Sequence, residues 1–217
     1  MATESSRPIR ARNPEEKQQR RSEILKAAER LWENTPYSEL SMNQVAREAK
    51  LAKGTLYLYY DTKEELFLSL LNEHLQAWFT DVQDLIKAQP VTSAAQITDV
   101  LVASLRPHLS LRRLILLLST VLERNIKPDS STEFRRLVRR NLHDISQQLD
   151  LPPEVTFRIL SHLYALVLGW HEASEAKSIS YPANDQEKPK YERPDFETEI
   201  ALALRAIVPV LMAEQTS

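Results

Sequence analysis

Apolar residues recur every three or four positions along most of the chain, the spacing that brings side chains to one face of an α-helix. The first such stretch begins at Asn13, a residue type that often caps helices, followed by Pro14 at the first helical position. It ends near residues 34–36, where an Asn-Thr-Pro sequence interrupts the pattern. No stretch alternates apolar and polar residues as a half-buried strand does, so the pattern predicts an all-α protein.

A second, longer pattern begins at Thr62 and continues to about Ala88, before Pro90 stops it. Its length predicts a helix that leaves an amino-terminal unit and enters a second one. Prolines separate the helices that the pattern predicts beyond this point, at about residues 93–105, 109–126, 131–149, 153–175 and 195–213. The polar segment 177–193 has two prolines and mixed charge, and it predicts an exposed loop.

Residues 41–66 read SMNQVAREAKLAKGTLYLYYDTKEEL and combine two short helical stretches, a tight turn and an aromatic cluster. Ser41 and Gln44 have the spacing of a capping box, and Thr62 and Glu65 repeat it before the long helix. Because a helix as short as the second one is not stable alone, its neighbours must hold it. The arrangement predicts a helix-turn-helix whose second helix enters the major groove of DNA.

The composition narrows the possible classes of function. The 217 residues include no cysteine, which excludes disulfides and agrees with a reducing, cytoplasmic location. Apolar runs such as residues 114–118 are far shorter than the roughly 20 residues of a membrane helix, and the first residues lack the apolar segment of a signal peptide. The two glycines, Gly54 and Gly169, cannot form a phosphate-binding loop. We therefore expect a soluble protein without a cofactor.

Charge is distributed unevenly along the chain. Residues 1–60 carry more Lys and Arg than Asp and Glu, whereas residues 61–217 carry more acidic residues than basic ones. Three arginines lie in residues 1–13, which are therefore either a basic arm that contacts DNA or a solubilising tail. The histidines are scattered, so their spacing supports no metal site. No nucleophile–base pair or carboxylate pair stands out by spacing, so an enzyme is not expected.

Several motifs follow one another in residues 24–66. They run from Ile24-Leu25-x-Ala27-Ala28-x-x-Leu31-Trp32, through Tyr37 and Ser41-Met42-x-x-Val45-Ala46, to Lys53-Gly54-Thr55-Leu56-Tyr57-x-Tyr59-Tyr60-x-Thr62-Lys63-Glu64-Glu65-Leu66. Together they resemble the DNA-binding domain of the TetR family of transcriptional regulators. The resemblance implies an amino-terminal three-helix helix-turn-helix domain joined to a larger helical bundle for ligand binding and dimerisation. The expected limits are a basic flexible arm at 1–13, a DNA-binding domain at 14–65 and the helical bundle at 66–217.

The turn between the two short helices departs from the family pattern. The family usually has alanine, glycine, an apolar residue and serine there, whereas this chain has Ala49, Lys50, Leu51 and Ala52. A left-handed conformation at Lys50 would cost about 1 kcal/mol, and the lack of a side-chain cap at Ala52 costs about the same. A packed domain tolerates both costs, and Lys50 offers one more positive charge for a phosphate.

The residues expected to contact DNA lie on both sides of this turn. Lys53 and Lys63 have the charge to neutralise phosphates, and Gly54 leaves room for the DNA backbone. Leu56 and Tyr60 are expected in the domain core instead. The full expected DNA-binding set is Ser41, Asn43, Gln44, Lys53, Gly54, Thr55, Tyr57, Tyr59 and Lys63.

Dimerisation and effector binding are expected of the carboxy-terminal helices. Two apolar stripes predict a four-helix interface between two copies, formed by Leu163, Leu166, Gly169, Trp170, Ile200, Leu204, Ile207, Val208 and Leu211. A small, mainly apolar effector would be bound by Trp78, Phe79, Leu101, Leu105, Phe134, Leu137, Tyr164, Val167 and His171. For both sets the alternative is ordinary packing in the core of one chain.

These features predict a ligand-responsive transcriptional regulator, more a repressor than an activator. It would bind a palindromic operator as a homodimer and be released by the effector. The alternatives are a DNA-binding regulator controlled by a protein partner and a sequence-tolerant DNA-coating protein. The ratio of specific to non-specific DNA affinity separates the coating protein from the regulators.

Overall fold

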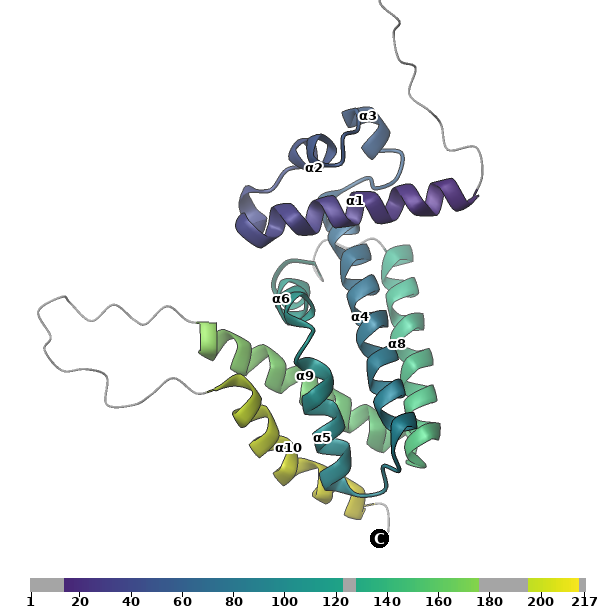
Figure 1. Ribbon diagram of the computed structural model, residues 1–217, viewed down its shortest axis with the longest axis vertical. Helices are drawn as coiled ribbons and strands as arrows, with labels where there is room; N and C mark the ends of the chain where they lie inside the picture. The colour runs from purple at the N-terminus through teal and green to yellow at the C-terminus, as the bar shows by residue number, and fades with distance from the viewer. Residues whose placement is uncertain (1–13, 123–127, 176–194, 215–217) are drawn as a thin grey trace, which may run out of the picture. The chain divides into compact units, whose positions relative to one another are not determined.

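The computed structural model describes residues 14–122, 128–175 and 195–214. Within these ranges the regular structure is helical and contains no strand, which confirms the all-α prediction (Figure 1). The chain divides into two compact units, the first of residues 1–72 and 120–131, the second of residues 73–119 and 132–217. The predicted basic arm and the predicted loop at 177–193 lie outside the described residues, and the predicted domain limits stay a prediction.

The first unit contains α1 (Pro14–Asn34), a 3₁₀ turn (Tyr37–Glu39), α2 (Met42–Glu48), α3 (Lys53–Leu56) and the start of α4 (Lys63–Ala88). The first predicted helix is confirmed at both ends, and its apolar stripe is buried. Phe67 of α4 is fully buried, and the rings of Trp32 and Tyr37 pack edge-on against it at centroid distances of 5.8 and 4.9 Å. This aromatic cluster fixes α1, the 3₁₀ turn and the start of α4 against one another.

The start of α4 is capped largely as the sequence predicts. The Glu65 amide donates to the Thr62 hydroxyl oxygen at 3.1 Å, which confirms the cap. The Glu65 carboxylate accepts from the amide of Asp61 at 3.0 Å, so the second half of the capping box is displaced by one residue. From this start α4 continues unbroken to Ala88 and contributes residues to both units.

The second unit contains the rest of α4, α5 (Ala94–Leu105), α6 (Leu109–Leu117), most of α8 (Pro128–Leu149), α9 (Pro153–Glu175) and α10 (Phe196–Ala213). Two helix boundaries differ from the prediction. The α-helical part of the 109–126 prediction ends at Leu117 and is followed by a π-helical turn at residues 118–122. The helix predicted from residue 131 begins at Pro128, because proline fits the first turn of a helix, where no amide partner is needed.

Helices α5, α9 and α10 pack together in the second unit, with α10 against both of the others (Figure 1). Hydrogen bonds between polar side chains join α4 to two helices of this unit, α5 and α8. The Trp78 indole donates to the Ser104 hydroxyl at 2.9 Å, which joins α4 to α5. The Gln83 amide of α4 donates to the Asn141 side chain of α8 at 3.1 Å, and Asn141 donates to the Leu137 carbonyl at 2.9 Å. These bonds fix the register of α4 against two neighbouring helices.

Candidate nucleic-acid interface

Helix α2 begins with the predicted capping box. The Gln44 amide donates to the Ser41 hydroxyl oxygen at 3.4 Å, and the Ser41 amide donates to the Gln44 side-chain oxygen at 2.8 Å. Two residues expected at the DNA surface therefore also hold the start of the helix. Asn43, the third expected residue of this helix, is exposed. Met42, Val45 and Ala46 are buried, so α2 is fixed by one face and its polar face stays accessible.

The turn after α2 has the left-handed conformation at Lys50 whose cost was considered from the sequence. Lys50 has a φ of 56°, the left-handed region that favours glycine. The Lys50 amide donates to the Arg47 carbonyl at 3.1 Å and the Leu51 amide to the Ala46 carbonyl at 2.8 Å, which together form a Schellman motif. The backbone thus closes the helix in the usual way, although a lysine occupies the position that glycine prefers. Ala52 supplies no side-chain cap to α3, as predicted.

Helix α3 and the residues that follow it, 57–60, present some side chains to solvent and others to the domain core. Leu56 is fully buried and Tyr60 is 3% exposed, which confirms both as core residues. Tyr57 is 39% exposed, and its ring lies 5.9 Å from the Lys53 ammonium. Leu58 is 69% exposed, although it is not among the DNA contacts expected from the sequence. Its position next to Tyr57 is the sequence feature that could have suggested it.

The other expected contacts on α3 and in the turn after it differ in exposure. Lys53 and Gly54 are exposed, whereas Thr55 and Tyr59 are half-buried. A β-carbon added to Gly54 would meet no atom within 4 Å, and Gly54 does not have a positive φ. Neither packing nor backbone conformation within the chain therefore demands a glycine at this position.

The Lys63 side chain makes its contacts within the first unit. Its ammonium donates to the carbonyls of Tyr37 and Leu40, at 2.8 Å each, and lies 4.0 Å from the Tyr37 ring centroid. Burial lowers the pKa of Lys63, although the neighbouring Glu64 carboxylate opposes that shift. The sequence predicted only a phosphate-binding role for this lysine. The structure adds a second role, because two of the three ammonium donors bind the backbone of the 3₁₀ turn region, and the phosphate contact stays a prediction.

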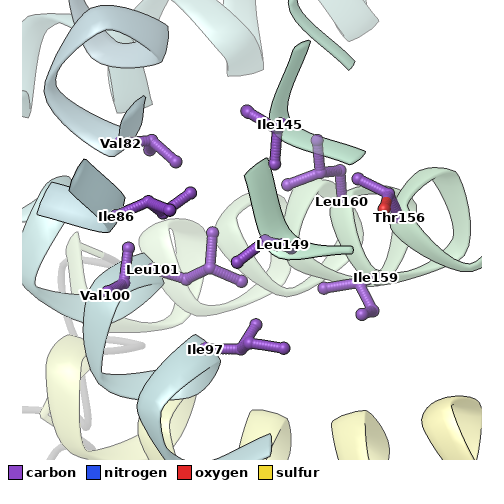
Figure 2. Close-up of a pocket in the computed structure, with 10 residues that line it drawn as sticks. All are labelled: Val82, Ile86, Ile97, Val100, Leu101, Ile145, Leu149, Thr156, Ile159 and Leu160. Carbon is purple, nitrogen blue, oxygen red and sulfur yellow. The ribbon is translucent and has the colours of Figure 1, made fainter. Parts of the chain in front are cut away.

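The residues expected at an effector site are mostly core residues of the second unit. Trp78, Phe79, Leu101, Leu105, Val167 and His171 are buried, Phe134 and Leu137 are half-buried, and Tyr164 is 37% exposed. A cavity of about 10 Å³ lies between α4, α5, α8 and α9, and Leu101 is the one member of the expected set that lines it. The cavity wall is formed by Val82, Ile86, Ile97, Val100, Leu101, Ile145, Leu149, Thr156, Ile159 and Leu160 (Figure 2).

The residues expected at the dimer interface divide into two groups. Leu163, Ile200, Leu204, Val208 and Leu211 are almost completely buried within one chain. This burial agrees with the alternative of core packing, and a role of these five residues in a dimer interface stays a prediction. Leu166, Trp170 and Ile207 are half-buried, and Gly169 is exposed. The large exposed apolar residues of α9 and α10 are instead Phe157, Tyr164, Leu202 and Val210.

Two features are absent from residues 14–122, 128–175 and 195–214. In these ranges no helix is both long enough and apolar enough to cross a membrane. No group of three or more His, Cys, Asp or Glu side chains comes together there as a metal site would require.

Comparison with known proteins identifies both parts of the chain. Residues 24–70 match the family of bacterial regulatory proteins called tetR, and residues 72–213 match the tetracyclin repressor-like C-terminal domain. The uncharacterized HTH-type transcriptional regulator YuxN of Bacillus subtilis (strain 168) is 36% identical over 59 residues, which are 27% of this chain and 20% of that protein. The chain spans between 20% and 34% of the length of the curated relatives it matches.

Solved structures match over nearly the whole chain. A TetR transcriptional regulator from Rhodococcus sp. RHA1 has 19% identity and a TM-score of 0.59, covering 92% of this chain and 98% of that one. Thermus thermophilus FadR, a TetR family transcriptional repressor in complex with lauroyl-CoA, has 19% identity and a TM-score of 0.54, covering 87% and 94%. At these identities the likeness shows a shared fold.

The helix-turn-helix of the first unit and the helical second unit define a DNA-binding transcriptional regulator. The chain belongs to the TetR family, because a family match extends over residues 72–213, more than half of its length, and a second one covers the helix-turn-helix. Members of this family are DNA-binding regulators and not enzymes.

Proposed function

We propose that this protein is a homodimeric repressor that binds a palindromic operator and dissociates from it when a small, mainly apolar effector binds the second unit. The observation that carries the proposal is the division of residues 53–60, α3 and the turn after it, into buried and exposed side chains. Leu56 and Tyr60 anchor the helix, while Lys53, Tyr57 and Leu58 are exposed together. A short helix with this division suits insertion into a major groove.

The exposed groups on α3 and the turn before it have complementary roles on DNA. Lys50 and Lys53 supply positive charge for phosphates, which contributes affinity without sequence information. The Tyr57 hydroxyl reaches a phosphate or a base edge, and the Leu58 side chain suits a thymine methyl group. The proposed interface also keeps flanking contacts from Ser41, Asn43, Gln44, Thr55 and Tyr59. Lys63 contributes its positive charge from the start of α4.

Dimerisation is proposed through the exposed faces of α9 and α10. Phe157 and Tyr164 are seven residues apart, two helical turns, so they lie on one face of α9. Leu202 and Val210 are eight apart and share a face of α10. Apolar side chains exposed in this way on two packed helices favour a four-helix interface with a second copy. The exposed Gly169 permits close approach there, since a β-carbon at this position meets nothing within its own chain.

Release by an effector requires that the effector bind one dimer arrangement better than another. Helix α4 is the candidate coupling element, because one unbroken helix supplies residues to both units. The FadR structure with lauroyl-CoA gives a precedent in a protein of the same fold. The proposed domains are those expected above, a basic arm at 1–13, a DNA-binding domain at 14–65 and a ligand-binding and dimerisation domain at 66–217.

A DNA-binding titration tests the proposal. Purified protein is titrated with DNA fragments from the region upstream of its own gene and with scrambled fragments, at two salt concentrations. A salt-dependent preference of about a thousandfold or more for one palindromic fragment supports a specific regulator. Equal affinity for every fragment would instead support a DNA-coating protein. A specific regulator that responds to no small molecule would support control by a protein partner.

Sedimentation tests the dimer. Leu202→Glu places a charge on the proposed interface and should shift the protein to monomer. Leu109→Glu is the matched control, because Leu109 is also an exposed leucine but belongs to α6, which is not one of the two proposed interface helices. A Leu202→Glu protein that sediments as the unaltered dimer would contradict this interface.

A further inference from the structure

The cavity of the second unit is apolar except at one point. Nine of its ten lining residues are Val, Ile or Leu, and the tenth is Thr156 of α9. Figure 2 shows Val82 and Ile86 on one side, Thr156 and Leu160 on the other, and the Thr156 hydroxyl as the one oxygen among the labelled side chains. The wall therefore combines an extended aliphatic surface with a single hydrogen-bonding group.

The Thr156 hydroxyl has no hydrogen-bond partner in the structure, although the residue is only 1% exposed. Other buried hydroxyls of this unit are paired: Thr98 donates to the Ala94 carbonyl at 2.9 Å, and Ser146 donates to the Leu151 carbonyl at 2.6 Å. A buried hydroxyl without a partner costs free energy, so it is exceptional in a folded protein.

The local backbone explains why Thr156 is unpaired. A helical threonine usually donates to the carbonyl four residues earlier, which here belongs to Pro152. That carbonyl already accepts hydrogen bonds from the amides of Val155, at 3.0 Å, and Thr156, at 3.1 Å. A carbonyl oxygen has two lone pairs, so both acceptor sites are occupied. A water molecule is also a poor partner, because a buried water normally needs two or more polar groups and the wall offers one.

We propose that this cavity widens to bind a neutral, mainly aliphatic molecule with one hydrogen-bonding oxygen, and that the Thr156 hydroxyl binds that oxygen. The inference rests on the proposed effector-controlled function and specifies the class of effector. Alcohols, ketones and esters belong to this class, because a hydroxyl both donates and accepts hydrogen bonds. Carboxylates do not, since the wall contains no positively charged side chain and a buried charge without a partner is strongly unfavourable.

The present cavity has room for about one water molecule, so the ligand must displace wall side chains. Those side chains are aliphatic and come from four different helices, so rotamer changes and small helix shifts can enlarge the space. The ligand then covers apolar surface and pairs the hydroxyl that one chain leaves unpaired. The ligand makes both the apolar contacts and the hydrogen bond only if its single oxygen reaches the Thr156 hydroxyl while its aliphatic part covers the rest of the wall.

The test compares three probes of equal chain length on the full chain: 1-hexanol, n-hexane and hexanoate, at neutral pH. Saturable chemical-shift changes of the Ile, Leu and Val methyl groups of the cavity wall report binding. We expect 1-hexanol to bind and hexanoate not to bind. Thr156→Val removes the hydroxyl with little change of shape, and should weaken 1-hexanol roughly threefold to tenfold while leaving n-hexane unchanged.

Thermal unfolding provides an independent signature of the unpaired hydroxyl. Thr156→Val should leave the unliganded protein equally stable or make it more stable, because no hydrogen bond is lost. Thr98→Val is the matched control, a buried threonine whose hydroxyl is paired and which lies outside the cavity wall, and it should lower the melting temperature. A lower melting temperature for Thr156→Val would mean that the hydroxyl is paired, and would overturn the proposal.

Three further results would also overturn it: no saturable binding of 1-hexanol, equal weakening of 1-hexanol and n-hexane by Thr156→Val, or tighter binding of hexanoate than of 1-hexanol. The proposed function fails separately. If 1-hexanol binds through Thr156 but a DNA fragment selected by the protein is bound with unchanged affinity, the ligand class stands and effector-controlled release does not.

Discussion

The ammonium of Lys63 donates a 2.8 Å hydrogen bond to the backbone carbonyl of Tyr37 and lies 4.0 Å from the centroid of the ring of the same residue. The two residues are far apart in sequence, at the start of α4 and in the 3₁₀ turn after α1. The lysine therefore closes the connection between α1 and α2 against the start of α4. A cation on an aromatic face and a charged donor on a carbonyl both contribute to the stability of the first unit.

Replacing this lysine should destabilise the first unit. Lys63→Ala removes two charged hydrogen bonds and the cation–π contact, and should lower the free energy of unfolding by about 1 to 3 kcal/mol. Urea denaturation measures the change. Its control is Lys53→Ala, because Lys53 is an exposed lysine of α3 and should affect DNA affinity with little effect on stability. Equal stability of the two variants would show that the Lys63 contacts contribute nothing.

The phenol of Tyr37 makes the stability of the first unit change with pH in the alkaline range. Burial, and next the hydrogen bond to the Glu64 carboxylate at 3.0 Å, raise the pKa of Tyr37 above its usual value of 10.0. Above pH 10 the unfolded chain releases this proton while the folded chain keeps it. The contribution of Tyr37 to stability is therefore complete below that pH and decreases as the pH rises further.

The expected result is a steeper alkaline loss of stability in the unaltered protein than in Tyr37→Phe. Lys63 acts in the opposite direction, since burial lowers its pKa, but that effect is present in both proteins. Urea unfolding at a series of pH values from neutral to strongly alkaline measures both slopes. Parallel slopes would contradict the raised pKa.

The caps and the turn of the helix-turn-helix were predictable because they depend on residues close in sequence. Ser41 and Gln44 are three residues apart, and the position of Lys50 in a tight turn between two short helices made a left-handed conformation one to consider. The role of Lys63 was not predictable in the same way. Its acceptors lie more than 20 residues earlier, so their proximity depends on the packing of α1 against α4.

The core of the second unit illustrates a second limit. Helix α10 has apolar residues on more than one face, with Leu204 fully buried and Leu202 64% exposed. Periodicity alone does not tell which face meets the neighbouring helices when both are apolar. From the sequence, the same residues can therefore be assigned either to an interface or to the core. The unpaired state of the Thr156 hydroxyl was equally unpredictable from the sequence, since it depends on which amides donate to the Pro152 carbonyl.

Tyr57 is expected to contribute to DNA binding and not to stability. It is 39% exposed, and Tyr57→Ala should weaken binding of a selected DNA fragment by about 1 to 3 kcal/mol. Titration of the fragment and sedimentation of the protein measure the two properties. Leu58→Ala is a matched variant at a more exposed neighbour, and should reduce the preference for the selected fragment more than the affinity for scrambled DNA. Unchanged affinity in Tyr57→Ala would remove this side chain from the interface.

Gly54 distinguishes packing within the chain from close approach of DNA. A β-carbon at this position meets no atom within 4 Å, and the residue lies inside α3 without a positive φ. Gly54→Ala should therefore stabilise the folded protein by about 0.5 to 1 kcal/mol, because alanine loses less conformational freedom in a helix than glycine. If glycine is needed because the DNA backbone comes close, the same substitution should weaken every DNA complex, whatever its sequence. Urea denaturation and titration with selected and scrambled fragments measure the two effects in one variant. A protein that is more stable and binds DNA as before would mean that α3 does not approach the DNA backbone at Gly54. The proposed orientation of α3 in the major groove would then be wrong.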